Sequence, residues 1–426
     1  MKSYALKLMT GTAALSLMLA ACAVPQPAAQ PAAPAAEAPA AAAAPTEAPA
    51  AAAGAEFKVG LIFVGPQEDK GWNQAHLEGS KYVMSKLPNV KFEYFDKVNP
   101  GDRPNVKGSQ VADDLIAKGN KVIIFNSDDF KDDALETAKK HPDVVVIHAS
   151  GDYAWKEGQN FKDQKNLGNL MMRMEPGWMI AGCNAALATE TGKIGTVGPL
   201  INAETRRYAS SAYLGAKYCW ENYRKKDIKD LEFKVTWIGF WFNIPGVTLD
   251  PTKVADDFLN GGYDVLMSAI DTPEVAVQTK KAAEAGKSVK FAHYDYKLGC
   301  DQAPEQCIGV HYYNWGPGYT DIIKQASEGT YTSTWTWAEA NWKDLNNADT
   351  SAIGYLRGNA LSADNGAFLD QFIAGIGDGS IDLWKGPLKF QDGKEFLKDG
   401  QKATPQEVWY LPQLLEGMVG QSVPSQ

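Results

Sequence analysis

Short apolar runs alternate with amphipathic stretches along most of this chain. Lys58–Val64 (KVGLIFV) and Val122–Phe125 (VIIF) are typical of buried strands. Between them, Val106–Lys118 repeats apolar residues at the spacing that lines one face of a helix. Near-continuous apolar strands that alternate with helices predict a parallel sheet covered on both faces.

This alternation occurs twice, which predicts two α/β lobes. The first half has expected strands at Lys58–Val64, Val90–Phe95, Val122–Phe125 and Val144–His148, and helices at Asn73–Lys86, Val106–Lys118 and Asp132–His141. The second half has expected strands at Ile194–Val197, Phe233–Phe240, Val265–Ile270 and Val289–Tyr294, and helices at Met179–Thr189, Glu204–Tyr223, Pro251–Asn260 and Pro273–Ala285. Ligands of open parallel sheets bind beyond the carboxyl ends of the strands, so we expect the site in the cleft between the lobes.

The first 22 residues have the pattern of an export signal. Lys2 and Lys7 precede the apolar stretch Met9–Ala21, which is too short to remain as a membrane-spanning helix. The sequence Leu-Ala-Ala-Cys that ends at Cys22 is typical of a bacterial lipoprotein cleavage site, so we expect Cys22 to be acylated. The alternative is an ordinary signal peptide with a chance cysteine.

Residues 23–55 consist almost entirely of Ala and Pro, which predicts a disordered tether. No later stretch is long and apolar enough to cross a bilayer. We therefore expect a folded body that begins near Phe57 and is held by lipid on the extracytoplasmic side of the cell membrane.

The composition and the absence of several motifs argue against some classes of function for this protein. The 426 residues are 45% hydrophobic and 22% charged, which fits a folded chain of two or three domains. A net charge of −9 argues against a nucleic-acid partner, because phosphate binding needs a basic surface. The sequence contains no phosphate-binding loop, GxGxxG, GxSxG, HExxH or CxxC motif. We expect neither an enzyme nor a protein that needs a cofactor or a metal.

Polar and aromatic residues gather where the expected strands end. They are Asp69, Trp72, Asn73, Asn126 and Asp128 in the first half, and Trp241, Phe242, Asp271 and Asp295 in the second. Aromatic rings and carboxylates without a cluster of cations favour an uncharged ring that carries N–H and O–H donors. Such a site does not suit a phosphate or a carboxylate ligand.

Four cysteines remain after Cys22, in a compartment that permits disulfides. Cys300 and Cys307 flank a turn-like segment and are candidates for a bridge. Cys183 and Cys219 fall in expected helices, where we expect two buried thiols; a second bridge is possible if the two helices pack together.

An ordered series of stretches resembles the basic membrane protein family, whose members are substrate-binding lipoproteins of ABC importers for nucleosides and purines. The stretches are KVGLIFVGPQEDKGWNQAHLEG at Lys58–Gly79, GNKVIIFNSDDF at Gly119–Phe130, TGKIGTVGPLINAETRRYASSAYLGAKY at Thr191–Tyr218, VTWIGFWFNIPGVTLDPTKVADDFLNGGYDVLMSAID at Val235–Asp271, HYYNWGPGY at His311–Tyr319 and WKGPLKFQDGKE at Trp384–Glu395. The stretches with Trp72 and Trp315 are similar to the branch that takes a free purine base such as adenine.

This resemblance implies a class I periplasmic-binding-protein fold, in which the chain crosses between two α/β lobes three times. The first lobe would comprise residues 57–168 and 315–342, and the second lobe residues 169–314. Residues 343–426 would form an extension, with a hairpin near Gly386–Phe396, that packs mainly on the second lobe and the hinge.

The resemblance also implies roles for the residues at the strand ends. Trp72 would stack on a base from the first lobe, and Trp241 or Phe242 would press on it from the second. Hydrogen bonds would come from Asp69, Asn73, Asn126 and Asp128 in the first lobe, and from Asp271, Asp295 and Trp315 in the second lobe and hinge. The partners would be a purine or nucleoside, an ABC permease with its ATPase, and the membrane through the lipid anchor, and the protein would act as a monomer.

Two other functions remain compatible with the sequence. The same fold could bind a sugar or a signalling molecule, since aromatic rings and carboxylates suit those ligands as well. A surface enzyme or an adhesin could also use this scaffold.

Overall fold

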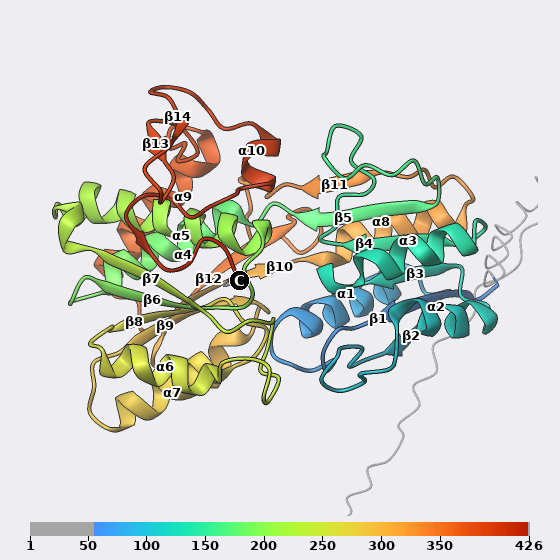
Figure 1. The fold of residues 1–426 in the computed structure, drawn as a ribbon, viewed down its shortest axis with the longest axis horizontal. Helices are drawn as coiled ribbons and strands as arrows, with labels where there is room; N and C mark the ends of the chain where they lie inside the picture. The colour runs from blue at the N-terminus through green and yellow to red at the C-terminus, as the bar shows by residue number, and fades with distance from the viewer. Residues whose placement is uncertain (1–54, 425–426) are drawn as a thin grey trace, which may run out of the picture. The chain divides into compact units, whose positions relative to one another are not determined.

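Two sheets, one in each lobe, organise the part of the chain that the computed structural model describes, residues 55–424 (Figure 1). The first sheet has the order β11 (Trp335–Ala338), β5 (Leu167–Met172), β4 (Val145–Ala149), β3 (Val122–Phe125), β1 (Phe57–Ile62) and β2 (Val90–Phe95), and all its pairs are parallel. The second has the order β12 (Ile353–Arg357), β10 (Cys307–Tyr313), β9 (Lys290–Asp295), β8 (Val265–Ser268), β6 (Lys193–Gly198), β7 (Glu232–Trp237) and β15 (Met418–Val419), and β12 alone among these seven is antiparallel to its neighbour.

Helices cover the sheets of both lobes. The first lobe has α1 (Trp72–Lys86), α2 (Gly108–Ala117), α3 (Lys131–Lys140) and α8 (Trp315–Ser327). The second has α4 (Glu175–Ala188), α5 (Ala203–Asn222), α6 (Pro251–Asn260), α7 (Glu274–Glu284) and α9 (Ala363–Asp378). The central strands are buried along their whole length, as in β3 and β8, because helices shield both faces. The expected alternation of strands and helices, and the α/β fold class, are therefore confirmed.

Two central strands, β5 and β10, have no counterpart among the expected strand ranges. The six residues of β5 (LGNLMM) are all buried, and it pairs with β4 and β11 in the first sheet. The expected lobe boundary after Gly168 falls inside this strand, so residues 169–172 lie in the first lobe rather than the second. The chain passes between the sheets three times: after β5, after β10, and between β11 and β12.

The C-terminal extension joins the second lobe and also contacts the first. Strands β12 and β15 belong to the second sheet, and β13 (Leu388–Lys389) and β14 (Glu395–Leu397) form an antiparallel hairpin. Just after α10 (Pro405–Trp409), the Tyr410 hydroxyl donates to Asp152 Oδ2 of the first lobe at 2.6 Å. Arg206 Nε of the second lobe donates to the Leu411 carbonyl at 2.8 Å.

Two disulfides are present among the described residues, where only one had been favoured. Cys300 and Cys307 form the expected bridge. Cys183 and Cys219 are also bridged, with Cα atoms 5.2 Å apart, which corrects the expectation of two free thiols. The reason is the close packing of α4 on α5 at two glycines: a Cβ on Gly182 would lie 1.9 Å from the Ala212 carbonyl oxygen, and one on Gly215 would lie 2.0 Å from that of Met179.

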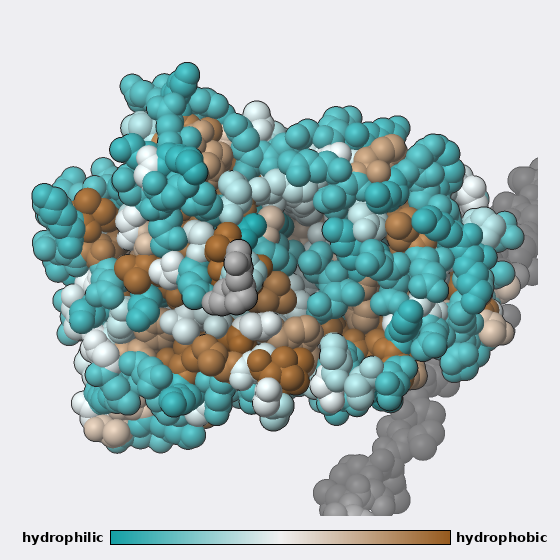
Figure 2. All heavy atoms as spheres, viewed as in Figure 1, coloured by the Kyte–Doolittle hydropathy of each residue, from teal (hydrophilic) through white to brown (hydrophobic). Residues whose placement is uncertain are grey.

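The export signal, Cys22 and residues 23–54 lie outside the described residues. Within the described part, no helix combines the length and the apolar character that a membrane crossing requires. Most of the face seen in Figure 2 is hydrophilic, and hydrophobic side chains show on the second lobe and near the seam between the lobes.

The bridge between α4 and α5 should contribute measurably to stability. In the chain-entropy model, a loop of 36 residues corresponds to about 4 kcal/mol and one of 7 residues to about 2 kcal/mol. We expect the Cys183→Ala/Cys219→Ala variant to lose more free energy of unfolding than the control Cys300→Ala/Cys307→Ala, as measured by urea denaturation under oxidising conditions. Equal stability of the first variant and the wild type would contradict this expectation.

A candidate ligand-binding cleft between the lobes

A cavity lies where the strand ends of the two sheets meet. The space free of protein atoms there is about 550 Å³, including the part that is open to solvent. Its wall contains four indoles (Trp72, Trp178, Trp237 and Trp241), three phenols (Tyr208, Tyr294 and Tyr313) and three carboxyl groups (Asp128, Glu204 and Asp271). No lysine, arginine or histidine of residues 55–424 lines it.

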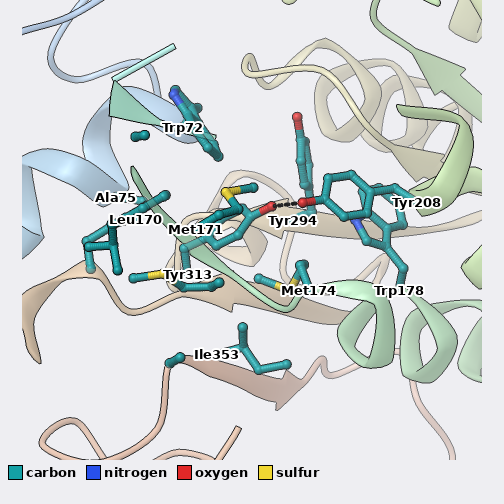
Figure 3. Packing of buried hydrophobic residues seen from close by; sticks show 14 of the residues in the cluster. Trp72, Ala75, Leu170, Met171, Met174, Trp178, Tyr208, Tyr294, Tyr313 and Ile353 are labelled. Atoms are coloured by element: carbon teal, nitrogen blue, oxygen red, sulfur yellow. Dashed lines mark hydrogen bonds between the residues drawn. The ribbon is translucent and has the colours of Figure 1, made fainter. Parts of the chain in front are cut away.

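Four of the residues expected to bind ligand line this cavity. Trp72 and Asp128 come from the first lobe, and Trp241 and Asp271 come from the second. Each follows the carboxyl end of a strand, or lies in the loop or helix directly after it, which is where ligands of parallel sheets bind. Figure 3 shows Trp72 on the side of α1, facing the side from which Tyr208 and Trp178 project, with Tyr313 between them.

The Trp72 ring is held from behind by its own lobe and the hinge. Its indole N–H donates to the Asn126 carbonyl. Trp315 lies edge-on to it, with ring centroids 5.3 Å apart, and Tyr313 does the same at 5.2 Å. Trp315 in turn stacks on His76 at 4.0 Å. Trp315 therefore supports Trp72 and is not among the residues that line this cavity.

Asp69, Asn73 and Asn126 form a buried network beneath the loop that carries Trp72, rather than a part of the cavity wall. Asp69 accepts hydrogen bonds from the backbone N–H groups of Gly71, Asn73 and Gln74 at 2.9 to 3.0 Å. Asn126 Nδ2 donates to Asn73 Oδ1 at 2.8 Å, and Asn126 Oδ1 accepts from the Val64 N–H at 3.0 Å. These polar groups are used to fix the start of α1 and are not directed at the cavity.

Phe242 and Asp295 also lie outside the wall. Phe242 packs at the seam against the first lobe, where a Cβ on Gly65 would lie 3.3 Å from its ring. Asp295 is fully buried directly after Tyr294, and neither of its carboxylate oxygens makes a hydrogen bond within the described residues. Burial, and then the charge of Asp271, raise the pKa of Asp295 well above its usual range.

The two lobes touch around the cavity, so the cleft is closed. The Gln74 side chain of the first lobe donates to the Tyr296 hydroxyl of the second at 3.3 Å. Gly71 lies so close to the second lobe that a Cβ there would be 2.1 Å from the Asp271 carbonyl oxygen. Only glycine fits at this position, because any side chain would force the lobes apart.

Three residues in or near the cavity wall have a strained backbone conformation. Lys70, Ser150 and Asp295 have φ angles of +67°, +66° and +67°, a conformation that costs most non-glycine residues about 1 kcal/mol or more. Ser150 lines the cavity, Lys70 lies in the loop before α1, and Asp295 ends β9 directly after the wall residue Tyr294. Such strain is found preferentially where a side chain or a loop is held in place for binding.

Several wall residues were not among the expected ones: Trp178, Glu204, Tyr208, Trp237, Tyr294 and Tyr313. Two of them carried a signal that could have been used, since Tyr294 ends an expected strand and Tyr313 is close to Trp315 in the sequence. Glu204 carried none, because it lies in the first turn of α5. Its carboxyl group is buried, which raises its pKa to about 7, while Arg207 acts in the opposite direction.

The fold is that of two-lobed solute-binding proteins. A solute-binding protein of an ABC transporter system from Aeropyrum pernix K1 superposes with a TM-score of 0.58 at 14% identity, covering 78% of this chain and 93% of that one. Another from Conexibacter woesei DSM 14684 superposes with a TM-score of 0.53 at 16% identity, covering 76% and 98%. At this identity the likeness concerns the fold alone.

The sequence comparisons identify the family. A family model described as ABC transporter substrate-binding protein, PnrA-like, matches residues 57–347. A purine-binding protein of Brucella abortus (strain 2308) is 28% identical over 361 residues, which are 82% of this chain and 89% of the relative. Basic membrane protein A1 of Borrelia garinii is 24% identical over 248 residues, which are 58% and 64% of the two chains. The chain belongs to the Bmp family of ABC transporter substrate-binding proteins, as its motifs indicated.

The buried Glu204 carboxyl makes stability depend on pH. Its pKa rises from 4.5 in the unfolded chain to about 7 in the fold, so the folded state loses stability as pH rises through this window. We expect Glu204→Gln, which stays neutral, to gain up to about 3 kcal/mol relative to the wild type between pH 4.5 and 7.5. Denaturant unfolding at several pH values measures this difference, and a difference that does not change with pH would contradict it.

Proposed function

We propose that this protein is the substrate-binding lipoprotein of an ABC importer that captures a purine base of the adenine type, or a purine nucleoside, and delivers it unchanged to a membrane permease with its ATPase. The observation that carries this proposal is that Trp72 and Trp241, from opposite lobes, line one closed cavity with carboxyl groups and without cations. The purine-binding relative in Brucella abortus supports the same ligand class.

The cavity wall suits a flat heterocycle. Trp72 and Trp241 line the cavity from the two lobes, and stacked or edge-on contacts between aromatic rings and a ligand would add about 0.5–1.5 kcal/mol beyond the burial of surface. Asp128 and Asp271 supply acceptors for the N–H groups of the ring edge or for ribose hydroxyls. In this proposal Asp69, Asn73, Asn126 and Trp315 serve the ligand indirectly, by fixing the Trp72 ring.

Closure of the cleft is the step that captures the ligand. A ligand that touches both lobes favours the closed state by its higher affinity for that state. Contacts such as Gln74 to Tyr296 form between the lobes in this state and can be made only when they meet. The closed pair of lobes would then be the surface that the permease recognises, and no covalent chemistry is needed.

The proposed lipid anchor would hold the two-lobed body at the outer surface of the cell membrane. A diacylated or triacylated Cys22 would be held stably, since two or three chains anchor far better than one. The Ala/Pro stretch that follows would let the folded body reach the permease.

Replacing Trp72 should weaken purine binding. We expect Trp72→Ala to lose at least about tenfold in affinity for adenine by calorimetry, because a stacking face and buried area are removed, and Trp72→Phe to lose less. Trp342→Ala, a half-buried indole away from the cavity, serves as the control. Unchanged affinity in Trp72→Ala would reject the stacking role.

The lipid anchor has a direct test. We expect Cys22→Ser to abolish incorporation of radiolabelled fatty acid and to move the protein from the membrane fraction to the soluble fraction of the producing cells. Retention of the label in this variant would show that Cys22 is not the acylated residue.

A further inference from the structure

The loop that follows β7, residues 239–250, reaches from the second lobe to the first, and we call it the arm. The strands next to the crossings, β5 and β11 in the first sheet and β10 and β12 in the second, lie at one edge of each sheet. Strands β1 and β2 of the first sheet and β7 of the second lie toward the opposite edge (Figure 1). The arm therefore leaves the second lobe on the side far from the crossings, where hinge motion separates the lobes most. This side is the mouth of the cleft.

Two apolar side chains of the arm rest on glycines of the first lobe. A Cβ on Gly65 would lie 3.3 Å from Phe242 Cε1, and a Cβ on Gly101 would lie 3.0 Å from Ile244 Cγ2. Phe242 is 7% exposed and Ile244 is 6% exposed, although both lie in a loop. Opening of the cleft would separate these side chains from the two glycines and expose apolar surface to water, which is unfavourable.

The part of the first lobe that receives the arm is held rigidly. The Asn99 side chain donates to the Val64 carbonyl at 2.8 Å and accepts from the Gly101 N–H at 2.9 Å. The Lys97 N–H donates to the Gly65 carbonyl at 3.1 Å, so the segments that carry the two glycines are tied together. Gly65 and Gly101 therefore form one fixed surface.

The arm is held in the same way by the second lobe. The Ile244 N–H donates to the Thr248 hydroxyl at 2.9 Å within the arm. The Asp271 N–H donates to the Trp241 carbonyl at 3.0 Å, which fastens the arm to the loop after β8. We therefore expect the arm to move with the second lobe as one piece.

The arm also carries one residue of the cavity wall. Trp241 lines the cavity, whereas Phe242 and Ile244 are not among the residues of the wall. Because the three residues belong to one short, hydrogen-bonded loop, the contacts of Phe242 and Ile244 with the first lobe set how closely Trp241 approaches it. The arm thus joins the closing of the mouth to the completion of the wall.

We propose that Phe242 and Ile244 are positioning residues that latch the mouth of the cleft: packed on Gly65 and Gly101, they set how fast a bound ligand leaves without contacting it. Release requires opening, and opening requires both side chains to leave the glycines, so their burial slows dissociation. Capture is affected less, because the latch forms only after the ligand has entered. The proposal holds for any ligand on which the cavity closes and does not depend on the purine of the proposed function.

The first test measures the release of adenine from the full-length protein, followed by tryptophan fluorescence in a stopped-flow instrument. We expect Ile244→Ala to release adenine at least about tenfold faster than the wild type, with an association rate within about twofold. Phe242→Ala should act in the same direction. Val247→Ala is the matched control, because Val247 lies on the same arm and is 76% exposed, and it should leave both rates unchanged.

A cysteine pair tests the contact itself and needs no ligand. The γ carbons of Ile244 lie 3.0 and 3.4 Å from the position of a Cβ on Gly101, which is close enough for a disulfide. The full-length Gly101→Cys/Ile244→Cys variant is stripped of ligand by unfolding and refolding without reductant and is then oxidised. We expect a bridge by mass spectrometry and a smaller radius of gyration by small-angle scattering, because oxidation traps the closed state that the ligand-free protein samples. Gly101→Cys/Val247→Cys, the control, should form no bridge.

The possible results separate this proposal from the proposed function. Release of adenine from Ile244→Ala at the wild-type rate, or no bridge in Gly101→Cys/Ile244→Cys, would overturn the latch and leave the purine receptor intact. If no base or nucleoside binds to the wild type, the proposed function fails, and the cysteine pair alone decides on the latch.

Discussion

The carboxyl ends of two parallel sheets meet at one cavity, and the rest of the site depends on this constraint. Trp72, Asp128 and Ser150 arrive from the first sheet, and Trp241, Asp271 and Tyr294 arrive from the second. Neither lobe alone encloses a ligand, because each provides only one wall. The contact of Gly71 with the Asp271 backbone shows how closely the walls approach.

Several residues in or next to the cavity wall lie in the segments that cross between the lobes. Tyr313 ends β10 and lines the wall, and Trp315, two residues later, supports Trp72. On the other side, α4 begins directly after β5 with Glu175, which is paired with Arg207. Trp409 of the extension lies over this guanidinium at 4.4 Å, and it also lies edge-on to Trp335 and Trp337 of the first lobe. Removing one partner of a buried ion pair of this kind strongly destabilises the folded protein, because the other charge is left buried and unpaired. Through Trp409, the extension therefore shields the Arg207–Glu175 pair from water and contacts both lobes where the chain crosses between them.

The sequence predicted the architecture well. The spacing of apolar residues along the chain reflects which side chains are buried and whether a segment forms a helix or a strand. The strands and helices with regular alternation, such as β3 and α6, lie where expected. Strand β5 escaped notice because its apolar residues are interrupted by Gly168 and Asn169 and are not followed by a clear turn. The Cys183–Cys219 bridge depends on the distance between two helices, which the pattern within each helix does not report.

The candidate site could be predicted only in part, for a related reason. A strand end tells which loop lies at the cavity, but not which of its side chains are used to hold the loop itself. Asp69 and Asn126 looked like ligand groups because they are polar and follow strands, yet they are hydrogen-bonded within the first lobe. Glu204 looked like an ordinary helical residue, yet it faces the cavity because α5 begins there.

The two lobes contribute different kinds of groups to the cavity wall. In the proposed function Trp72 stacks on the ligand, and a stacking ring binds better when it is ordered before binding. The buried hydrogen bonds of the first lobe hold Trp72 in this way. The indole N–H of Trp72 is itself bonded to the Asn126 carbonyl, so the ring would contact a ligand through its carbon surface. In the proposed function, Asp128 of the first lobe and Glu204 and Asp271 of the second would supply the polar contacts when the cleft closes. A ligand that contacts both walls would then hold the lobes together.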